Sequence, residues 1–405
     1  MTTHKSEPIG TTQSPTGEVV VGVMADPVAT ALTVAKHLER VLPGLLAEQL
    51  ADGHWRVEVH RERLPPSDEK QFEMMDLAAE RKREHGWDLA VCVTDLPLMI
   101  DRRPVVADAD HSRNVAVVSL PAFGAMSLRR RVSEVVTQLI GDMRGGTILK
   151  DGSQAHRRSR VPALGGAFER TTPDQDGVDV RIFANRGRLR LLVGMVRDNR
   201  PWRLVSGLRG ALVGAFAFSA FYLLNATLWE LALTMAAWQL VAVVVASITV
   251  MITWLIVYHR LWERAKDLPP QERERTVLFN ASTVLTLAIG LTCGYAGLFV
   301  LNLTAALIVF TPEVFSQYAG GEYGLGEYLL VTLFATAAAT IAGAIGSGFE
   351  SEESVLEAAY SYRERKRREA RRRSRSAENN DSAVHDAAQN DDTSRAEDSD
   401  AGPDH

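Results

Sequence analysis

Long apolar stretches between residues 210 and 348 constrain the fold of this chain more than any other feature of its sequence. Four of them are candidate membrane spans, because about 20 apolar residues are needed to cross roughly 30 Å of hydrocarbon. They are Gly210–Leu228, Leu231–Val257, a stretch within Val277–Phe310, and Tyr328–Gly348. A helix buried in a globular domain is rarely so long and so uniformly apolar. The sequence therefore predicts an α-helical transmembrane bundle of four spans.

The charges in the connections between these stretches predict an orientation. Residues 225–234 and 311–327 contain no Lys or Arg, whereas 258–276 contain five and 363–375 contain nine. This alternation follows the positive-inside rule for a multi-pass protein of the cell (plasma) membrane with both termini in the cytoplasm. The 277–310 stretch could form one long kinked helix or a hairpin. We favour one helix, because a hairpin would place the nine-charge segment outside.

Composition divides the 405-residue chain into six segments. A cytoplasmic α/β domain precedes the bundle, and the ends are polar and expected to be disordered apart from one basic helix. The predicted segments are a disordered tail (1–17), the α/β domain (18–145), a linker with a basic juxtamembrane segment (146–209), the bundle (210–348), a basic cytoplasmic helix (349–376) and an acidic disordered tail (377–405).

Alternating patterns in the first third of the chain predict the α/β domain. Strands are expected at 18–24, 55–61, 87–93, 105–106 and 114–120. Helices are expected at 27–50, with a break near Pro43–Gly44, at 68–84 and at 127–143. Strands alternating with helices predict a three-layer arrangement around a mixed sheet. Residues 144–180 are expected to form a linker, with a hairpin near 178–183.

A polar segment after the third predicted strand supplies the candidate ligand-binding residues. Thr94 and Asp95 follow that strand, at the edge where open α/β sheets bind ligands. Asp101, Asp108, Asp110 and His111 come next, and Asp and His side chains of this kind could bind a divalent ion. The alternative is that these residues cap turns. We retain four ligand-binding candidates and assign no catalytic residue and no metal ligand: Thr94, Asp95, Asp108 and His111.

Nucleotide-binding motifs are missing from the sequence. The turn after the first strand contains one glycine, Gly22, where a dinucleotide fingerprint needs three, and no GxxxxGK[ST] occurs. Without those glycines the backbone cannot approach a pyrophosphate closely. A Rossmann-type site at this turn is therefore disfavoured, and the sequence names no cofactor.

Residues 87–140 resemble the core of archaemetzincin-type zinc proteases. The matching order is TDLPL, a β-excursion, AVVSL, and a helix opening with RRRVSEVVTQLIG. In that family the helix carries HExxH, whose two histidines bind zinc while the glutamate acts as general base. The matching residues here are Ser133 to Thr137, so Glu134 remains and both histidines are missing. The resemblance implies a metzincin-like fold that has lost its zinc, and no proteolytic activity.

The segment before the first span, Arg181–Arg209, is rich in arginine. It is expected to lie at the membrane interface and to bind anionic lipid headgroups. Nucleic-acid binding is disfavoured, because aromatic residues that could stack on bases are not interleaved with the arginines. The predicted interface residues are Arg186, Arg188, Arg190, Arg197, Arg200, Trp202 and Arg203.

The spans themselves contain small and uncharged polar residues. No Asp, Glu, Lys or Arg lies in the middle of a span, which argues against a proton-coupled pump. Asn225, Gln239, Asn280 and Asn302 either join helices by hydrogen bonds or line a path. Small residues four apart, such as Gly290 and Gly294, allow close packing within one bundle or in a homo-oligomer.

These observations favour a non-enzymatic multi-pass membrane protein. Its cytoplasmic α/β domain would bind a partner or a small ligand in a sensing, regulatory or scaffold role. Two alternatives remain open at this point. One is a membrane-anchored, metal-dependent enzyme that uses the Asp/His-rich loop, and the other is an oligomeric transporter of small solutes.

Overall fold

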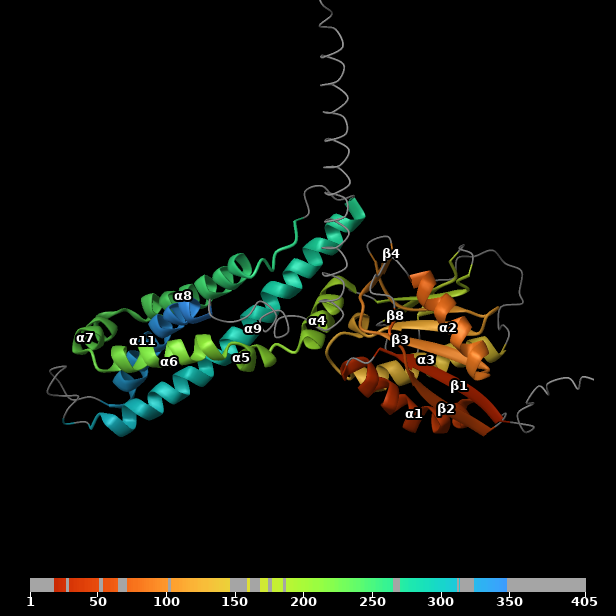
Figure 1. Ribbon diagram of the computed structural model, residues 1–405, viewed down its shortest axis with the longest axis horizontal. Coiled ribbons are helices and arrows are strands. Elements are labelled where there is room, and N and C mark those ends of the chain that lie inside the picture. Colours follow the sequence, from red (N-terminus) through yellow and green to blue (C-terminus); the bar gives the residue numbers. More distant parts are fainter. Residues whose placement is uncertain are drawn as a thin grey trace, which may run out of the picture. The chain divides into compact units, whose positions relative to one another are not determined.

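The structure is a computed structural model, and the chain divides into two compact units (Figure 1). The first unit comprises Met1–Asp198 and Glu263–Leu285, and the second comprises Asn199–Trp262 and Thr286–His405. The structure describes residues 18–26, 29–50, 54–64, 71–100, 103–145, 159–160, 168–173, 177–184, 187–264, 270–311, 313 and 324–347. The predicted tails, the basic helix at 349–376, Asp101 and Arg186 lie outside the described residues.

A mixed, nine-stranded sheet forms the centre of the first unit. Its strand order is β2-β1-β3-β6-β5-β9-β8-β7, with β4 paired to β5. Strands β2, β1, β3 and β6 run parallel to one another, whereas β5 is antiparallel to β6 and the pairs that involve β4, β7, β8 and β9 are antiparallel. The strands are β1 Glu18–Ala25, β2 His54–Arg61, β3 Leu89–Thr94, β4 Leu98–Ile100, β5 Arg103–Asp110, β6 Val115–Ser119, β7 Ser159–Arg160, β8 Phe168–Thr171 and β9 Val180–Ala184.

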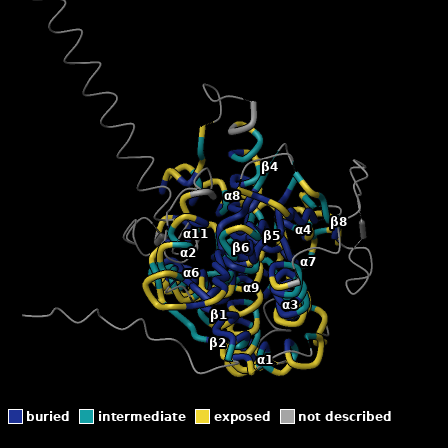
Figure 2. Tube along the Cα trace, turned by 90° about the vertical axis from the view of Figure 1, so that its right-hand side faces the viewer, coloured by how far each residue is buried: buried dark blue, intermediate teal, exposed yellow. Residues whose placement is uncertain are grey.

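Alternate residues of the central strands enter two different cores. Val19, Val21 and Val23 of β1 pack in one cluster with helices α1 (Ala29–Gln49) and α3 (Leu128–Gly145). Val20 and Met24 pack in a second cluster with α2 (Gln71–His85). Successive side chains of a strand point to opposite faces, so two clusters require apolar cover on both faces. The buried colour of the central strands in Figure 2 agrees with this arrangement.

Helix α1 corrects the predicted break at Pro43–Gly44. It runs without interruption from Ala29 to Gln49, with Pro43 inside it. A proline within a helix costs about 3 kcal/mol of helix stability. Leu42 and Leu46, on either side of it, are both fully buried in the first cluster. We infer that the packing of these two side chains outweighs the local cost.

The sheet extends beyond the residues predicted to form it. Strands β7 and β8 come from the stretch that was predicted to be a linker, whereas β9 coincides with the hairpin predicted near 178–183. Phe168 of β8 is fully buried in the first cluster and lies 5.6 Å from the ring of Phe123. Helix α4 (Gly187–Asn199) follows β9 and places Leu191 and Met195 in the same cluster.

The described part of the second unit consists of helices and the short segments between them. Three of the described helices are long and apolar enough to cross a membrane, and the candidate spans are Ala237–Tyr258, Arg273–Val309 and Leu325–Ile345. This indicates a membrane protein. Helix α11 packs along both α6 and α8. The helices are α5 Arg203–Gly207, α6 Arg209–Leu223, α7 Ala226–Thr234, α8 Ala237–Tyr258, α9 Pro270–Val309 and α11 Leu325–Ser347.

The first predicted span is not one straight helix. Helix α6 ends at Leu223, and α7 continues at an angle of 87°. The Asn225 side chain accepts a hydrogen bond from the Thr227 backbone N–H at 3.1 Å and caps α7. Trp229 Nε1 donates a hydrogen bond at 2.9 Å to the backbone carbonyl of Leu223, the last residue of α6. The second predicted span is also corrected, because its helix starts at Ala237 instead of Leu231.

Helix α9 confirms the single-helix interpretation of the third apolar stretch. It is continuous from Pro270 to Val309 and 40 residues long. Its residues up to Leu285 belong to the first unit, and those from Thr286 belong to the second. One helix thus contributes to both the α/β unit and the helical unit.

Candidate functional site

Successive strands are added on opposite sides of β1, and this reversal of strand order defines a candidate binding edge. The chain passes from β1 through α1 to β2 on one side, and then through α2 to β3 on the other side of β1. In open α/β sheets, ligands bind outside the carboxyl ends of the strands at such a switch point. The carboxyl ends of β1 and β3 are therefore the best-placed positions for a ligand in this unit.

Two buried aspartates follow these two strands. Asp26 comes directly after β1 and is 3% exposed, and Asp95 comes directly after β3 and is 5% exposed. The register pairs Ala25 with Val93, so both carboxylates lie at the same edge of the sheet. This edge of the sheet therefore holds two acidic side chains beside the switch point.

Thr94 and Ser119 organise the turn beside Asp95. Their backbones are paired across β3 and β6. Thr94 Oγ1 accepts a hydrogen bond from the Leu96 N–H at 3.1 Å, and Ser119 Oγ donates to the Leu96 carbonyl at 2.6 Å. Thr94, a predicted ligand contact, thus has its hydroxyl engaged in holding the 94–98 turn, whereas Asp95 stands at the switch point.

The structure does not bring Asp108 and His111 to this edge. Asp110 is paired with Val115, at the start of β6, whereas Thr94 is paired with Ser119, at its end. At about 3.3 Å per residue, the two ends of β6 are roughly 13 Å apart. His111 follows β5 at the far end and uses its backbone N–H to donate to Asp179 Oδ2 at 2.6 Å. In the described part of the chain, no three His, Cys, Asp or Glu side chains form a group that could hold a metal ion.

Asp108 forms a buried ion pair with Arg181. Arg181 Nε donates to both carboxylate oxygens, at 2.9 and 3.0 Å, and Nη2 donates to Oδ2 at 2.7 Å. Asp108 is fully buried and Arg181 is 4% exposed. The sequence placed Arg181 at the start of the arginine-rich juxtamembrane segment. The structure instead places it in β9, directly across from Asp108.

Asp110 is held by the residues of its own turn. Its carboxylate accepts hydrogen bonds from Ser112 Oγ at 2.6 Å and from Arg113 Nε at 2.5 Å. Burial by itself would raise the pKa of Asp110, but these hydrogen bonds outweigh burial and lower it. Arg113 also pairs with Asp76 of α2. Asp110 therefore holds its own turn, which Arg113 ties to α2, in line with the turn interpretation of this segment.

Three of the predicted interface arginines contact protein groups within the first unit. Arg188 pairs with Glu274 at 3.1 Å, and Arg190 lies 5.1 Å from the centre of the Phe168 ring. Burial, together with the nearby Arg131, lowers the pKa of Arg190. Arg197 donates to the Gly124 carbonyl and to Asp198 Oδ1. These contacts dock α4 onto the domain. Arg200, Trp202 and Arg203 belong to the second unit, where Trp202 is 60% exposed.

Asp26 and Arg181 were not among the predicted site residues. Asp26 had a detectable signal, because it ends the first strand as Asp95 ends the third, but an Asp before a proline also predicts a helix cap. Arg181 had no local signal. Its partner is 73 residues away in sequence, and only the pairing of β5 with β9 brings the two together.

The helix that would carry the zinc motif is present as α3. Its Ser133 and Thr137 hydroxyls donate to the backbone carbonyls one turn earlier, at Arg129 and Ser133. Glu134 accepts from Arg130 Nε at 2.8 Å in an exposed pair. These three side chains form hydrogen bonds within α3, and none of them is arranged to bind zinc.

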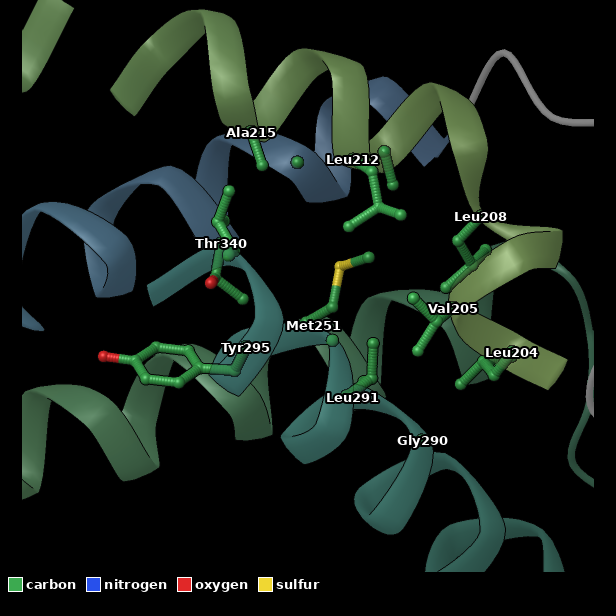
Figure 3. Close-up of a pocket in the computed structure, with 14 residues that line it drawn as sticks. Leu204, Val205, Leu208, Leu212, Ala215, Met251, Gly290, Leu291, Tyr295 and Thr340 are labelled. Atoms are coloured by element: carbon green, nitrogen blue, oxygen red, sulfur yellow. The ribbon is translucent and has the colours of Figure 1, made fainter. Parts of the chain in front are cut away.

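A small apolar cavity lies within the second unit (Figure 3). Its volume is about 50 Å³, well below the roughly 300–1,000 Å³ of ligand pockets. Met251 projects among the lining residues, and the polar groups at its rim are used elsewhere: the Tyr295 hydroxyl donates to the Leu333 carbonyl and Thr340 Oγ1 to the Thr336 carbonyl. The cavity is therefore a packing feature of the helices.

Two glycines of α9 line this cavity and provide a matched test. A Cβ at Gly290 would lie 2.7 Å from the Pro201 carbonyl oxygen, whereas one at Gly294 would meet Val205 at an ordinary 3.8 Å. We expect Gly290→Ala to destabilise the bundle by about 1–3 kcal/mol. Gly294→Ala should be neutral or stabilise it by up to about 1 kcal/mol. Thermal unfolding of the full chain in detergent measures both, and equal effects would contradict this packing.

Hydrogen bonds join polar residues within the helical unit. Asn302 Nδ2 donates to Ser219 Oγ at 2.9 Å and to Thr336 Oγ1 at 3.0 Å, which links α9 to α6 and α11. Gln239 accepts from the Ala236 N–H at 2.8 Å. Asn302 therefore joins helices as expected, whereas this contact of Gln239 lies at the start of its own helix, α8.

Comparison with known proteins identifies no relative: no family model, no curated protein and no solved structure matches the chain. What can be said of its class follows from its own geometry. It is a protein with a mixed α/β unit and three helices long and apolar enough for membrane spans.

Proposed function

We propose that the chain is a non-enzymatic, multi-pass protein of the plasma membrane with a sensing or regulatory role. In this proposal a three-layer, cytoplasmic α/β domain binds a small ligand or partner at the edge formed by Asp26 and Asp95. Four spans follow, with α6 and α7 counted as one bent span, and both termini lie in the cytoplasm. The charge pattern of the connections supports this orientation.

The continuity of α9 is the observation that carries the regulatory role. In the α/β unit, Phe279 belongs to the main core and Arg275 donates to the Met99 carbonyl at 2.9 Å. The Asn280 side chain accepts a hydrogen bond from the Glu263 backbone N–H at 3.0 Å and donates one to the Glu263 carbonyl at 2.9 Å. The same helix then continues as a candidate span to Val309. A rigid element shared by two units can transmit a change from one to the other.

Labelling of Cys293 tests this role. Cys293 is exposed on the part of α9 in the second unit, and Cys92 is buried, so a nitroxide reagent should label Cys293 alone. We expect Asp95→Asn to change the mobility of the label in the full chain reconstituted in nanodiscs. Allosteric couplings of about 5- to 150-fold are typical, and a shift of that size between two states would be visible in the spectrum.

Glu48→Gln is the matched control for this measurement, because Glu48 is an exposed carboxylate on α1. Identical spectra for all three proteins, with the α/β domain still folded, would refute the regulatory role. Reporter fusions test the topology separately. A reporter inserted at residue 318 should read as external and one after residue 405 as cytoplasmic, and the reverse readout at residue 318 would contradict the four-span orientation.

A further inference from the structure

A groove at the start of the α9 span combines positive charge with an apolar floor. It lies entirely within the first unit and has a volume of about 520 Å³, which is within the range of ligand sites. Two arginines and one glutamate line it together with apolar side chains. The lining residues are Met99, Arg188, Arg273, Glu274, Val277, Leu278 and Ala281.

The charges of this groove favour an anion. Arg188 pairs with Glu274 at 3.1 Å, and the pair is partly open to solvent because the Arg188 side chain is 56% exposed. Arg273 adds a second guanidinium and is also exposed. The ionised lining side chains thus carry a net charge of about +1. Guanidinium groups bind phosphate oxygens through charge-assisted, paired hydrogen bonds.

The order of residues along α9 matches the order of groups in a phospholipid. Arg273 lies in the first turn of α9, and exposed apolar residues follow on the same side at helical spacing, with Val277 58% exposed and Val284 36% exposed. Ala281, between them, is exposed as well. A headgroup phosphate beside Arg273 would therefore place the acyl chains along Val277, Ala281 and Val284.

Helix α4 presents a similar surface on the other side of the groove. Leu189 is 69% exposed and Val193 is 37% exposed, and these residues lie one turn apart beside Arg188. Exposed apolar side chains next to a cation are the pattern of interfacial helices. Both helices that supply the arginines of the groove thus also supply exposed apolar side chains.

We infer that this groove is a specific binding site for one anionic phospholipid, with the phosphate held by Arg188 and Arg273 and the acyl chains lying along α9. The inference rests on the proposed membrane location of the chain. It goes beyond general attraction to a charged bilayer, because it names the two arginines and gives Glu274 an opposing role. Glu274 competes with the lipid phosphate for Arg188.

Lipid retention by the full chain tests the site. The protein is reconstituted in nanodiscs of phosphatidylcholine containing a minor fraction of phosphatidylglycerol, released, and analysed by native mass spectrometry. We expect retained phosphatidylglycerol to fall about fivefold for Arg188→Gln and for Arg273→Gln, since each arginine near a membrane surface contributes about that factor. Glu274→Gln should raise retention, because it removes the competing carboxylate.

Arg56→Gln serves as the matched control, because Arg56 is an exposed, paired arginine of the same domain on the edge strand β2. Equal retention by all variants, or a fall for Glu274→Gln, would overturn the site. Displacement of the lipid by inorganic phosphate alone would also overturn it, since that outcome assigns the groove to a free anion. If the chain fails to enter nanodiscs at all, the proposed membrane location fails first, which is distinguishable from the loss of lipid selectivity in an inserted protein.

Discussion

Replacing Asp108 with alanine is expected to destabilise the α/β domain by about 3–5 kcal/mol. This substitution leaves Arg181 buried at 4% exposure without the carboxylate that accepts three of its hydrogen bonds. Removing one partner of a buried ion pair has this effect because the remaining charge cannot be solvated. Pulse proteolysis of the full chain in increasing urea gives the free energy of unfolding.

Two further variants separate the ion pair from general damage. Asp108→Leu combined with Arg181→Met should recover most of the lost stability, because an apolar pair of similar size removes both desolvation penalties. Glu134→Ala, which breaks the exposed pair with Arg130, should change stability by no more than about 1 kcal/mol. A single Asp108→Ala variant as stable as Glu134→Ala would show that the pair contributes little.

Replacing Gly194 with alanine is expected to displace α4 and to lower stability by about 3 kcal/mol. A Cβ at this position would lie 2.0 Å from the Pro121 carbonyl oxygen. Overpacking normally costs about 1–3 kcal/mol, and the upper end applies here because the obstructing atom belongs to the backbone of a buried turn. The contact of Arg197 with the Gly124 carbonyl should be lost together with the docking of the helix.

Limited proteolysis within 187–199 measures this displacement, with denaturant unfolding as a second readout. Gly44→Ala is the control, because a Cβ there meets nothing within 4 Å. It lies inside α1 and should stabilise the domain by up to about 1 kcal/mol. Unchanged cleavage of Gly194→Ala would mean that α4 and the turn after β6 can move apart without cost.

Much of the α/β unit could be predicted from local pattern. The strands at β1, β2, β3 and β6 and the helices α2 and α3 appear close to their expected positions. The spacing of apolar residues indicates which face of a helix or strand is buried, so it locates the elements that pack against a core. The same reasoning placed Asp95 at the carboxyl edge of the sheet, since a residue after a parallel strand lies at that edge whatever its neighbours are.

Errors arose wherever one part of the chain depends on a distant part. The Pro43 break did not occur, because Leu42 and Leu46 pack in the core. The composition of α4 did not reveal that Leu191 is fully buried against the domain. Thr94 and His111 are close in sequence, but the register of β5 and β6 sends them to opposite ends of the sheet.

The sequence by itself determined which segments are apolar enough for a membrane and which alternate as strands and helices, because hydropathy and periodicity are properties of neighbouring residues. Only the tertiary structure decided how the polar residues are used. Asp108 forms an ion pair with Arg181, Asp26 lies with Asp95 at the switch point, and Arg188 and Arg273 line one groove. Each of these pairs is separated by tens of residues, and strand order and helix packing alone bring them together.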